Sequence, residues 1–322
     1  MCTALLDTKC GNFFGRTLDL EYSLGEEVVI CPRNFPFPLC HGGDPQRKYA
    51  IVGTACVRDG KPLYFDGVNE VGVAGAALNF PLSAKYADYR CHKTNLASFE
   101  IIPYILGGCE SISEVREALL GVNITADAFS RAISPSPLHW IFSDRSGSLV
   151  VEVTAAGIKI HENPVGVLTN EPGFDFHLTR LADYAGLDAK TPKNTLSEDF
   201  KPTLYSRGLG AFGLPGDFSS VSRFVRAVFV KNHTSVEGAD GVERFFRMMS
   251  TVSVPQGCVI TDEGREVKTV YTSCMELDEP TYYFTTYGRS AVRAVSLRRG
   301  APSSSELLRF SMSGGEQIVF LN

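Results

Sequence analysis

Residues 1–19 read MCTALLDTKCGNFFGRTLD. The apolar run 3–6 has the character of a strand, and it is followed by a turn and a returning strand. A hairpin of this kind folds Arg16 and Asp19 back beside Cys2. A cation near a cysteine sulfur favours the thiolate form, and a carboxylate can hold and orient an amine. An ordinary surface ion pair is the alternative interpretation of Arg16 and Asp19.

Cys2 is a candidate nucleophile because it directly follows the initiator methionine. Removal of Met1 leaves Cys2 with a thiol and a free α-amino group, which are a nucleophile and a base in one residue. At neutral pH such a pair can exchange a proton without a separate histidine. Any chain can carry cysteine at its second position by chance, so Cys2 alone is a weak signal.

The composition is that of a globular protein with a large core. The chain has 322 residues, of which 44% are hydrophobic and 21% charged, and we expect one domain over residues 1–322. The formal net charge of -5 argues against nucleic acid or an anionic membrane as a partner, since either requires a basic surface. We find neither a basic segment followed by an apolar stretch at the start nor a long apolar run, and therefore expect a cytoplasmic protein.

Cysteine and histidine usage predicts no metal site. The nine cysteines are odd in number and form no C-x-x-C pair, which disfavours a disulfide framework and a zinc site. The six histidines are scattered without metal-ligand spacing, and His139 beside Trp140 is interpreted as a structural residue entering a strand.

Strand and helix signals alternate in blocks along the chain. Strands are expected at 27–31, 49–57, 71–80, 140–143, 148–154, 157–161, 166–168, 268–277, 281–287 and 291–297. Helices are expected at 97–109, 111–120, 176–185, 222–231 and 241–249. The strands from 140 to 168 should form one meander, and residues 190–219 are expected to be irregular. This order predicts two sheets packed face to face between helical layers.

Residues 208–213, GLGAFG, match the dinucleotide-binding pattern G-x-G-x-x-G. That pattern needs a strand before it and a helix that opens at its last glycine. Here residues 202–207 precede it and Pro215-Gly216-Asp217 follows, so the match is rejected. A nucleotide-binding oxidoreductase therefore remains only a remote alternative.

Several motifs in a fixed order resemble the choloylglycine hydrolase family, which contains the bile salt hydrolases and penicillin V acylases. They are Met1-Cys2-Thr3, Phe14 to Asp19, Pro32 to Phe35, Asp66 to Glu70, Leu78 to Pro81, Leu138-His139-Trp140, Leu168 to Pro172, Gly213 to Asp217, Ser222-Arg223-Phe224 and Tyr271-Thr272-Ser273. The resemblance covers essentially the whole chain and is greatest to bacterial bile salt hydrolases. It implies an α+β fold of the N-terminal-nucleophile hydrolase type, a four-layer αββα sandwich with two mainly antiparallel sheets, and a homotetramer.

The resemblance also implies catalytic roles and no cofactor. Cys2 becomes the nucleophile and its α-amino group the base, with loss of Met1 in the mature enzyme. The other implied residues are the tuning pair Arg16 and Asp19, the oxyanion-binding Asn79 and Asn170, and Arg223. Without the family, Asn79 is a polar residue in an apolar strand and Asn170 is a turn residue.

The choice of substrate follows from the same resemblance. Asn79 in Leu78-Asn79-Phe80-Pro81 favours bile salt hydrolases over Gram-positive penicillin V acylases, which tend to carry tyrosine there. We therefore expect amide hydrolysis of taurine- or glycine-conjugated bile salts through a thioester, with acyl transfer to amino acids as a side activity. Penicillin V acylase activity and a catalytically silent bile-acid-binding protein are the alternatives.

Two groups of residues are candidates for binding such a substrate. Leu18, Phe65, Phe129 and Ile133 are expected to line an apolar slot for the steroid, and ordinary core packing is the competing interpretation. Ser206 and Arg207 are associated with a preference for taurine conjugates, because a guanidinium can hold a sulfonate through charge-assisted hydrogen bonds.

Overall fold

The structure is a computed structural model that describes residues 1–43, 45, 48–238, 240–300, 303–315 and 321. Its first sheet has six antiparallel strands and contains the predicted β1–β2 hairpin. The strand order is β13 (Val167–Leu168), β1 (Cys2–Asp7), β2 (Phe13–Leu20), β14 (Lys268–Glu276), β15 (Thr281–Thr286) and β16 (Arg289–Ser296). Strands from both ends of the chain therefore lie side by side in one sheet.

The second sheet has nine strands, all paired antiparallel. Along it run β12 (Gly157–Glu162), β11 (Gly147–Thr154), β10 (Leu138–Asp144), β7 (Ala74–Asn79), β6 (Asp66–Asn69), β4 (Ile51–Arg58), β3 (Glu27–Cys31) and β17 (Leu308–Ser311), and β5 (Lys61–Tyr64) pairs with β4. A separate parallel pair is formed by β8 (Thr94–Ala97) and β9 (Val122–Thr125).

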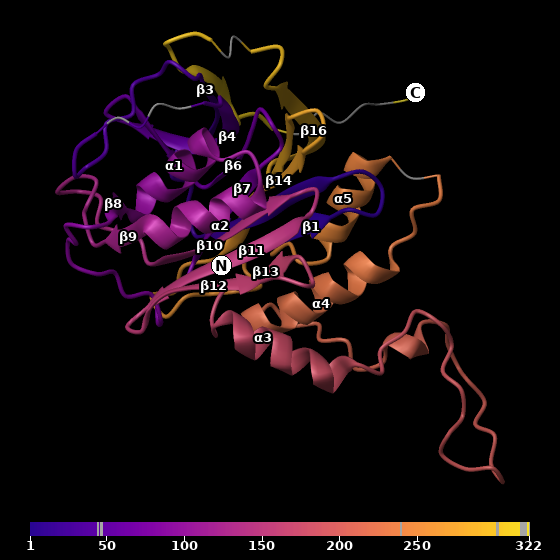
Figure 1. Cartoon of the computed structure of the whole chain (residues 1–322). Coiled ribbons are helices and arrows are strands. Elements are labelled where there is room, and N and C mark those ends of the chain that lie inside the picture. Colours follow the sequence, from indigo (N-terminus) through magenta and orange to yellow (C-terminus); the bar gives the residue numbers. More distant parts are fainter. Residues whose placement is uncertain (44, 46–47, 239, 301–302, 316–320, 322) are drawn as a thin grey trace.

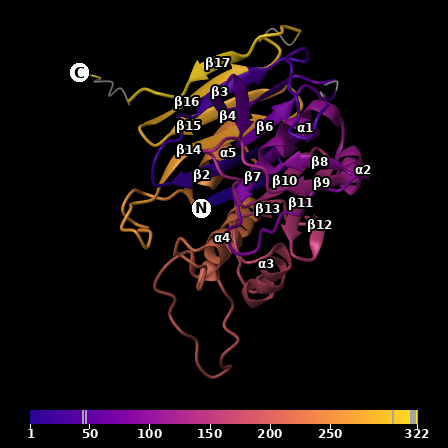
Figure 2. The same cartoon turned by 90° about the vertical axis from the view of Figure 1, so that its left-hand side faces the viewer.

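Helices cover the outer faces of the two stacked sheets (Figures 1 and 2). The six-stranded sheet is covered by α4 (Ser220–His233) and α5 (Gly241–Ser250), with α3 (Phe174–Arg180) packed on α4. The nine-stranded sheet is covered by α1 (Ile101–Gly108) and α2 (Ile112–Gly121). Short 3-10 turns lie at Ser98–Glu100, Leu181–Tyr184 and Leu209–Ala211. The expected αββα arrangement is confirmed.

Two apolar cores hold these layers together. The larger core lies between the sheets and under α4 and α5, and it includes residues of β1, β3, β4, β10 and β14. The smaller core lies between the nine-stranded sheet and helices α1 and α2. Strands with two buried faces explain the nearly continuous apolar runs in the sequence. Within β7, only Asn79 is exposed.

The strand predicted at 166–168 does not continue the meander. Asn163 Oδ1 accepts hydrogen bonds from the backbone N–H groups of Val165 and Gly166, and Gly166 adopts a φ of 66°. This turn directs β13 into the other sheet, where Ala4 pairs with Leu168. The correction matters because residues 169–170 then follow a strand that is paired directly with β1.

The other predicted elements need smaller changes. Helix α3 begins at Phe174 rather than Phe176, because the buried Glu152 carboxylate accepts the Phe174 N–H at 2.8 Å and satisfies the first turn. Strands β5, β6, β8, β9 and β17 were not predicted. Residues 208–213 contain only the 3-10 turn Leu209–Ala211, as the rejection of the dinucleotide motif requires.

The irregular segment 190–219 projects away from the body of the molecule (Figures 1 and 2). The chain leaves the body after α3 and returns to it at α4. Among the residues that the structure describes, no helix combines the length and the apolar character needed to cross a bilayer.

Candidate active site

The β1–β2 hairpin brings Arg16 to the sulfur of Cys2. Cys2 is paired with Leu18 and Ala4 with Arg16, so Cys2 and Arg16 lie on adjacent strands. Arg16 Nη2 donates to Cys2 Sγ at 2.5 Å, and Nη1 donates to the Ala77 carbonyl at 2.6 Å. Arg16 is fully buried. A buried cation in direct contact with a thiol favours its thiolate.

Acidic side chains surround the Arg16 guanidinium. Burial alone lowers the pKa of Arg16, but Cys2, Tyr271, Asp66 and Asp19 together raise that pKa above its ordinary value. The Asp66 carboxylate lies 4.0 Å from Arg16 Nε. It also accepts hydrogen bonds from Tyr271 Oη at 2.5 Å and from Tyr282 Oη at 2.6 Å. The result is a fixed positive charge at the sulfur.

Asp66 and the two tyrosines were not among the predicted site residues. Asp66 and Tyr271 lie within the quoted motifs, which was the available signal. Desolvation in this fully buried position raises the pKa of Asp66, although Arg16 and the tyrosine hydroxyls oppose that rise. The network spans both sheets, because Asp66 is on β6 and the tyrosines are on β14 and β15.

Asn170 and Arg223 hold the backbone of Cys2. Cys2 N donates to Asn170 Oδ1 at 2.8 Å, and the same oxygen accepts a bond of 2.8 Å from Arg223 Nη2. Arg223 Nη1 donates to the Cys2 carbonyl at 2.5 Å and to Thr3 Oγ1 at 2.6 Å. The partners come from α4 and from the residues after β13. The nitrogen of Cys2 therefore has a defined acceptor.

Asp19 reaches this site through hydroxyl groups and through its backbone. Its carboxylate accepts bonds from Thr269 Oγ1 at 2.6 Å and from Thr17 Oγ1 at 3.2 Å. Its carbonyl accepts the terminal amine of Met1 at 2.7 Å, and its own N–H donates to the Met1 carbonyl at 3.0 Å. Asp19 and Cys2 are thus linked through Met1 rather than by a direct side-chain contact.

Asn79 lies at the end of β7 beside Asn170. The Asn79 carbonyl accepts Asn170 Nδ2 at 2.9 Å. Its own carboxamide is exposed and has no hydrogen-bond partner among the described residues. Five of the six predicted catalytic residues are connected by direct side-chain contacts or by short chains of hydrogen bonds: Cys2, Arg16, Asp19, Asn170 and Arg223. Asn79 is connected to them through its backbone carbonyl.

The predicted substrate residues fall into two groups. Leu18 is paired with Cys2, and the Phe65 carbonyl accepts Arg16 Nη1 at 3.3 Å, so both lie at the site. Phe129 packs edge-on against Phe99 with ring centroids 5.3 Å apart, and Ile133 forms a bridge with Ser130.

Ser206 and Arg207 are exposed on the projecting segment, where Ser206 Oγ donates to the Arg207 carbonyl. The structure shows no bond from this pair to the Cys2 site within the described part of the chain.

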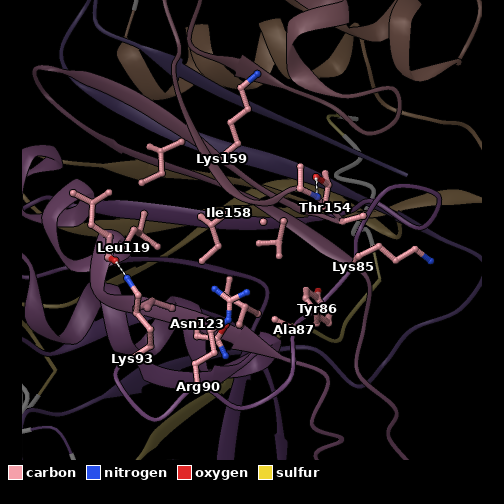
Figure 3. A pocket seen from close by; sticks show the side chains of 18 of the residues that line it. Lys85, Tyr86, Ala87, Arg90, Lys93, Leu119, Asn123, Thr154, Ile158 and Lys159 are labelled. Atoms are coloured by element: carbon pink, nitrogen blue, oxygen red, sulfur yellow. Dashed lines mark hydrogen bonds between the residues drawn. The ribbon is translucent and has the colours of Figure 1, made fainter.

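A separate cavity of about 680 Å³ lies beside β9, β12 and the end of α2, and no predicted catalytic residue lines it (Figure 3). Five basic side chains line this cavity, but Lys93 is bonded to the Leu120 carbonyl and Arg116 to Glu162. Lys159 is bonded to Asp175. In Figure 3, Lys85 and Lys159 extend away from its centre. We assign it no role in the reaction.

The chain matches known proteins along nearly its whole length. Residues 2–308 match the family of linear amide C–N hydrolases, choloylglycine hydrolase family. Over 325 residues the chain is 40% identical to the "Bile salt hydrolase/transferase" of Lactiplantibacillus plantarum, and the match covers 100% of both chains.

Two solved structures are similar in fold. The C2A mutant of the conjugated bile acid hydrolase from Clostridium perfringens has a TM-score of 0.93 and 33% identity, with 100% of each chain covered. Penicillin V acylase from Agrobacterium tumefaciens has a TM-score of 0.77 and 21% identity, covering 96% of this chain and 90% of the other. The expected N-terminal-nucleophile hydrolase fold is confirmed by these likenesses.

Proposed function

Because this chain belongs to the choloylglycine hydrolase family of linear amide C–N hydrolases, we propose that it hydrolyses taurine- and glycine-conjugated bile salts to free bile acid and amino acid. The names of the similar proteins support this substrate class. One observation carries the proposal: Arg16 contacts the Cys2 sulfur at 2.5 Å while Asn170 accepts the Cys2 N–H at 2.8 Å. Both reactive atoms of an N-terminal cysteine are thereby oriented.

Removal of Met1 is the activating step of the proposal. While Met1 is present, the nitrogen of Cys2 belongs to a peptide bond and cannot act as a base. Cys2 is also only 2% exposed, and Met1 is bonded to the Asp19 backbone beside it. Loss of Met1 converts this nitrogen to an amine and leaves Asn170 Oδ1 to orient it.

The chemistry then proceeds in two stages. The α-amine of Cys2 takes the thiol proton, and the sulfur attacks the substrate carbonyl. The amine passes the proton to the departing amino acid as the C–N bond breaks, which leaves a thioester. Water attacks the thioester and the amine accepts a proton from that water. As the C–S bond breaks, the ammonium returns this proton to the sulfur, so that release of the bile acid restores the thiol and the free amine. No cofactor enters this sequence.

The other catalytic residues take supporting roles. Arg16 stabilises the thiolate, and Asp19, held by Thr17 and Thr269, favours the charged form of the amine. Asn79 and Asn170 bind the oxyanion, with the free carboxamide of Asn79 as the principal donor.

Arg223 anchors the Cys2 carbonyl and Asn170 Oδ1. In this role it fixes the direction of the amine and of the Asn170 side chain together.

We assign binding of the steroid body of the substrate to Leu18, Phe65, Phe129 and Ile133. Leu18 is supported by its cross-strand pairing with Cys2, which places its apolar side chain next to the reacting sulfur, and Phe65 is supported by its backbone carbonyl, which accepts Arg16 Nη1. Phe129 and Ile133 extend the assignment to the loop between β9 and β10. A rigid apolar substrate gains affinity from such a surface.

We assign two roles to the projecting segment 190–219: recognition of the amino-acid headgroup of the substrate and contacts between subunits. Leu196 and Tyr205 on this segment are 92% and 83% exposed, which supports burial against other copies in a homotetramer. Arg207 selects the sulfonate of taurine conjugates through its guanidinium.

Arg207→Gly should lower the ratio of taurocholate to glycocholate turnover, and an unchanged ratio would exclude Arg207 as the selector. Static light scattering of the intact protein should give the mass of four chains.

The proposal is tested by amino-acid release from an equimolar mixture of taurocholate, glycocholate and penicillin V, with Cys2→Ala as the control. Release of taurine or glycine by the intact enzyme alone is expected. Cleavage of penicillin V alone would make it an acylase, and no turnover by protein lacking Met1 would favour a silent binder. Intact mass verifies the loss of Met1, and cell fractionation tests the cytoplasmic location.

A second activity is favoured by the word transferase in the name of the Lactiplantibacillus plantarum relative. An amine that replaces water would attack the same thioester and form a new amide. Adding a second amino acid to the assay and measuring its bile acid conjugate tests this activity.

A further inference from the structure

Two buried histidines bind consecutive backbone carbonyls beside the candidate site. His139 Nε2 lies 3.0 Å from the Thr169 carbonyl oxygen, and His177 Nε2 lies 2.9 Å from that of Asn170. Both side chains are fully buried. They come from different layers, because His139 is on β10 of the nine-stranded sheet and His177 is on α3.

The peptide groups that the histidines hold carry the Asn170 side chain, which connects three parts of the site. Asn170 Oδ1 accepts Cys2 N and Arg223 Nη2, and Asn170 Nδ2 donates to the Asn79 carbonyl. The backbone N–H of Asn170 donates to Ser220 Oγ at 2.8 Å. Any shift of this peptide therefore moves the acceptor of the Cys2 nitrogen.

Each histidine is set up to donate through Nε2. A carbonyl oxygen only accepts, so Nε2 must carry the proton. The Nδ1 atoms of both rings are buried without a hydrogen-bond partner. Burial, as the largest cause, lowers the pKa of His177. The nearest acid to His139 is Glu152, whose Oε1 lies 3.6 Å from Nδ1 and also accepts the Phe174 N–H.

Stacking fixes both rings. His139 is stacked on Phe80 with ring centroids 4.3 Å apart, and His177 is stacked on Phe224 at 4.7 Å. Phe224 follows Arg223 on α4, so one helix supplies both the arginine that binds Asn170 Oδ1 and the ring that supports His177. The direction of each N–H is thus determined by packing.

We infer that His139 and His177 are positioning residues for amide cleavage: their Nε2–H groups hold the Thr169–Asn170 backbone so that the Asn170 carboxamide meets the nitrogen of Cys2. They do not touch the substrate. The inference rests on the proposed function, because it assumes that this nitrogen is the base of the reaction. A displacement of about 1 Å at such a site can cost about 100-fold in rate.

A crossed pair of substitutions separates the hydrogen bond from the packing. His177→Gln keeps an N–H donor but loses the ring, whereas His177→Phe keeps the ring and loses the donor. We expect His177→Phe to lower kcat per reactive Cys2 about 10- to 100-fold with little change in KM, and His177→Gln to restore most of that loss. The number of reactive Cys2 thiols is counted by mass spectrometry after iodoacetamide treatment.

His233 supplies the matched control. It also binds a backbone carbonyl, that of Phe229, and stacks on a phenylalanine, but it is exposed at the end of α4. His233→Phe and His233→Gln should both leave kcat unchanged. The same crossed pair at His139 tests the Thr169 bond independently.

The opposite order of activities, with the Phe variants active and the Gln variants impaired, would overturn the inference in favour of packing. Equal kcat per reactive thiol in all variants would also overturn it. If the Phe variant at one histidine does not fold, the crossed pair at the other histidine carries the test with the same outcomes. If the wild type releases no amino acid, the proposed function fails instead, and the alkylation rate of Cys2 across the variants still tests the positioning.

Discussion

Asn79 differs from the other predicted catalytic residues because its side chain is exposed while theirs are buried. Asn79→Ala should lower kcat about 100- to 1,000-fold, because in the proposed mechanism its carboxamide is one donor to the oxyanion. KM and Tm should change little, since the carboxamide has no bond to lose among the described residues. Steady-state kinetics and thermal melting measure both effects.

Asn34→Ala, at an exposed asparagine outside the site, is the control and should keep the wild-type kcat. An Asn79→Ala enzyme with normal kcat would remove Asn79 from oxyanion binding.

At the residue scale, the local sequence pattern and the family resemblance predicted different residues of the site. The hairpin alone predicted that Arg16 would lie beside Cys2, and the structure has this contact. Asn170 and Arg223 were predicted only through the family resemblance, because nothing in their local sequence indicates a contact with residues 2 and 3. Asp66 was missed as a site residue, since its partners Arg16, Tyr271 and Tyr282 come from strands of the other sheet and contacts across sheets leave no local periodicity.

At the scale of elements, β2 lies between β1 and β14, and Gly15 is the position on β2 where no side chain fits. A Cβ atom at Gly15 would stand 2.0 Å from the Ser273 carbonyl oxygen and 2.9 Å from the Phe245 ring. Gly15→Ala should therefore lower the free energy of unfolding by about 3 kcal/mol or more, because the backbone must move. Urea denaturation measures the loss.

Gly108→Ala is the matched control at the end of α1, where nothing lies within 4 Å of the new Cβ. It should be neutral or stabilise by up to about 1 kcal/mol, because alanine favours the helix. Equal stability of the two variants would show that β2 can move away from β14 without cost.

The strand β13 marks where element prediction from sequence failed. Two residues are too short to show an alternating pattern, so their apolar character does not reveal a partner strand. The partner is determined by the turn at Asn163–Gly166 and by the free edge of β1. In contrast, α4 and α5 were predicted within two residues at each end. Both helices begin at a polar cap, Ser219 for α4 and Asp240 for α5.

At the scale of the whole molecule, stability should depend on Lys231. Its ammonium is mostly buried and donates to the Val165 carbonyl at 2.7 Å, which ties α4 to the turn before β13. Burial first, and then Lys9, lower the pKa of Lys231 to about 8. The unfolded chain thus binds more protons between about pH 8 and 10.5, and stability rises with pH in that window.

The Lys231→Met variant should not show this rise of stability with pH. Relative to the variant, the wild type should gain on the order of 1–3 kcal/mol in the free energy of unfolding between pH 7 and pH 10. Denaturant titrations at each pH measure it, with the exposed Lys193→Met as the control. Parallel pH curves for wild type and Lys231→Met would contradict the prediction.

The layered architecture was predictable because strand and helix signals occur in blocks, and two-sided burial gives β7 an apolar run that sequence reveals directly. The irregular character of segment 190–219 was also predicted. Its projection from the body was not, since direction depends on the contacts at both of its ends rather than on composition.

The place of β1 in its sheet has a consequence for synthesis. One neighbour of β1 is β2, which is synthesised directly after it, and the other is β13, which is synthesised some 150 residues later. The second neighbour of β2 is β14, which lies near the end of the chain. Contacts this distant in sequence form late. We expect the first strand to stay accessible through most of translation, so that an aminopeptidase removes Met1 from the nascent chain before the sheet closes over Cys2.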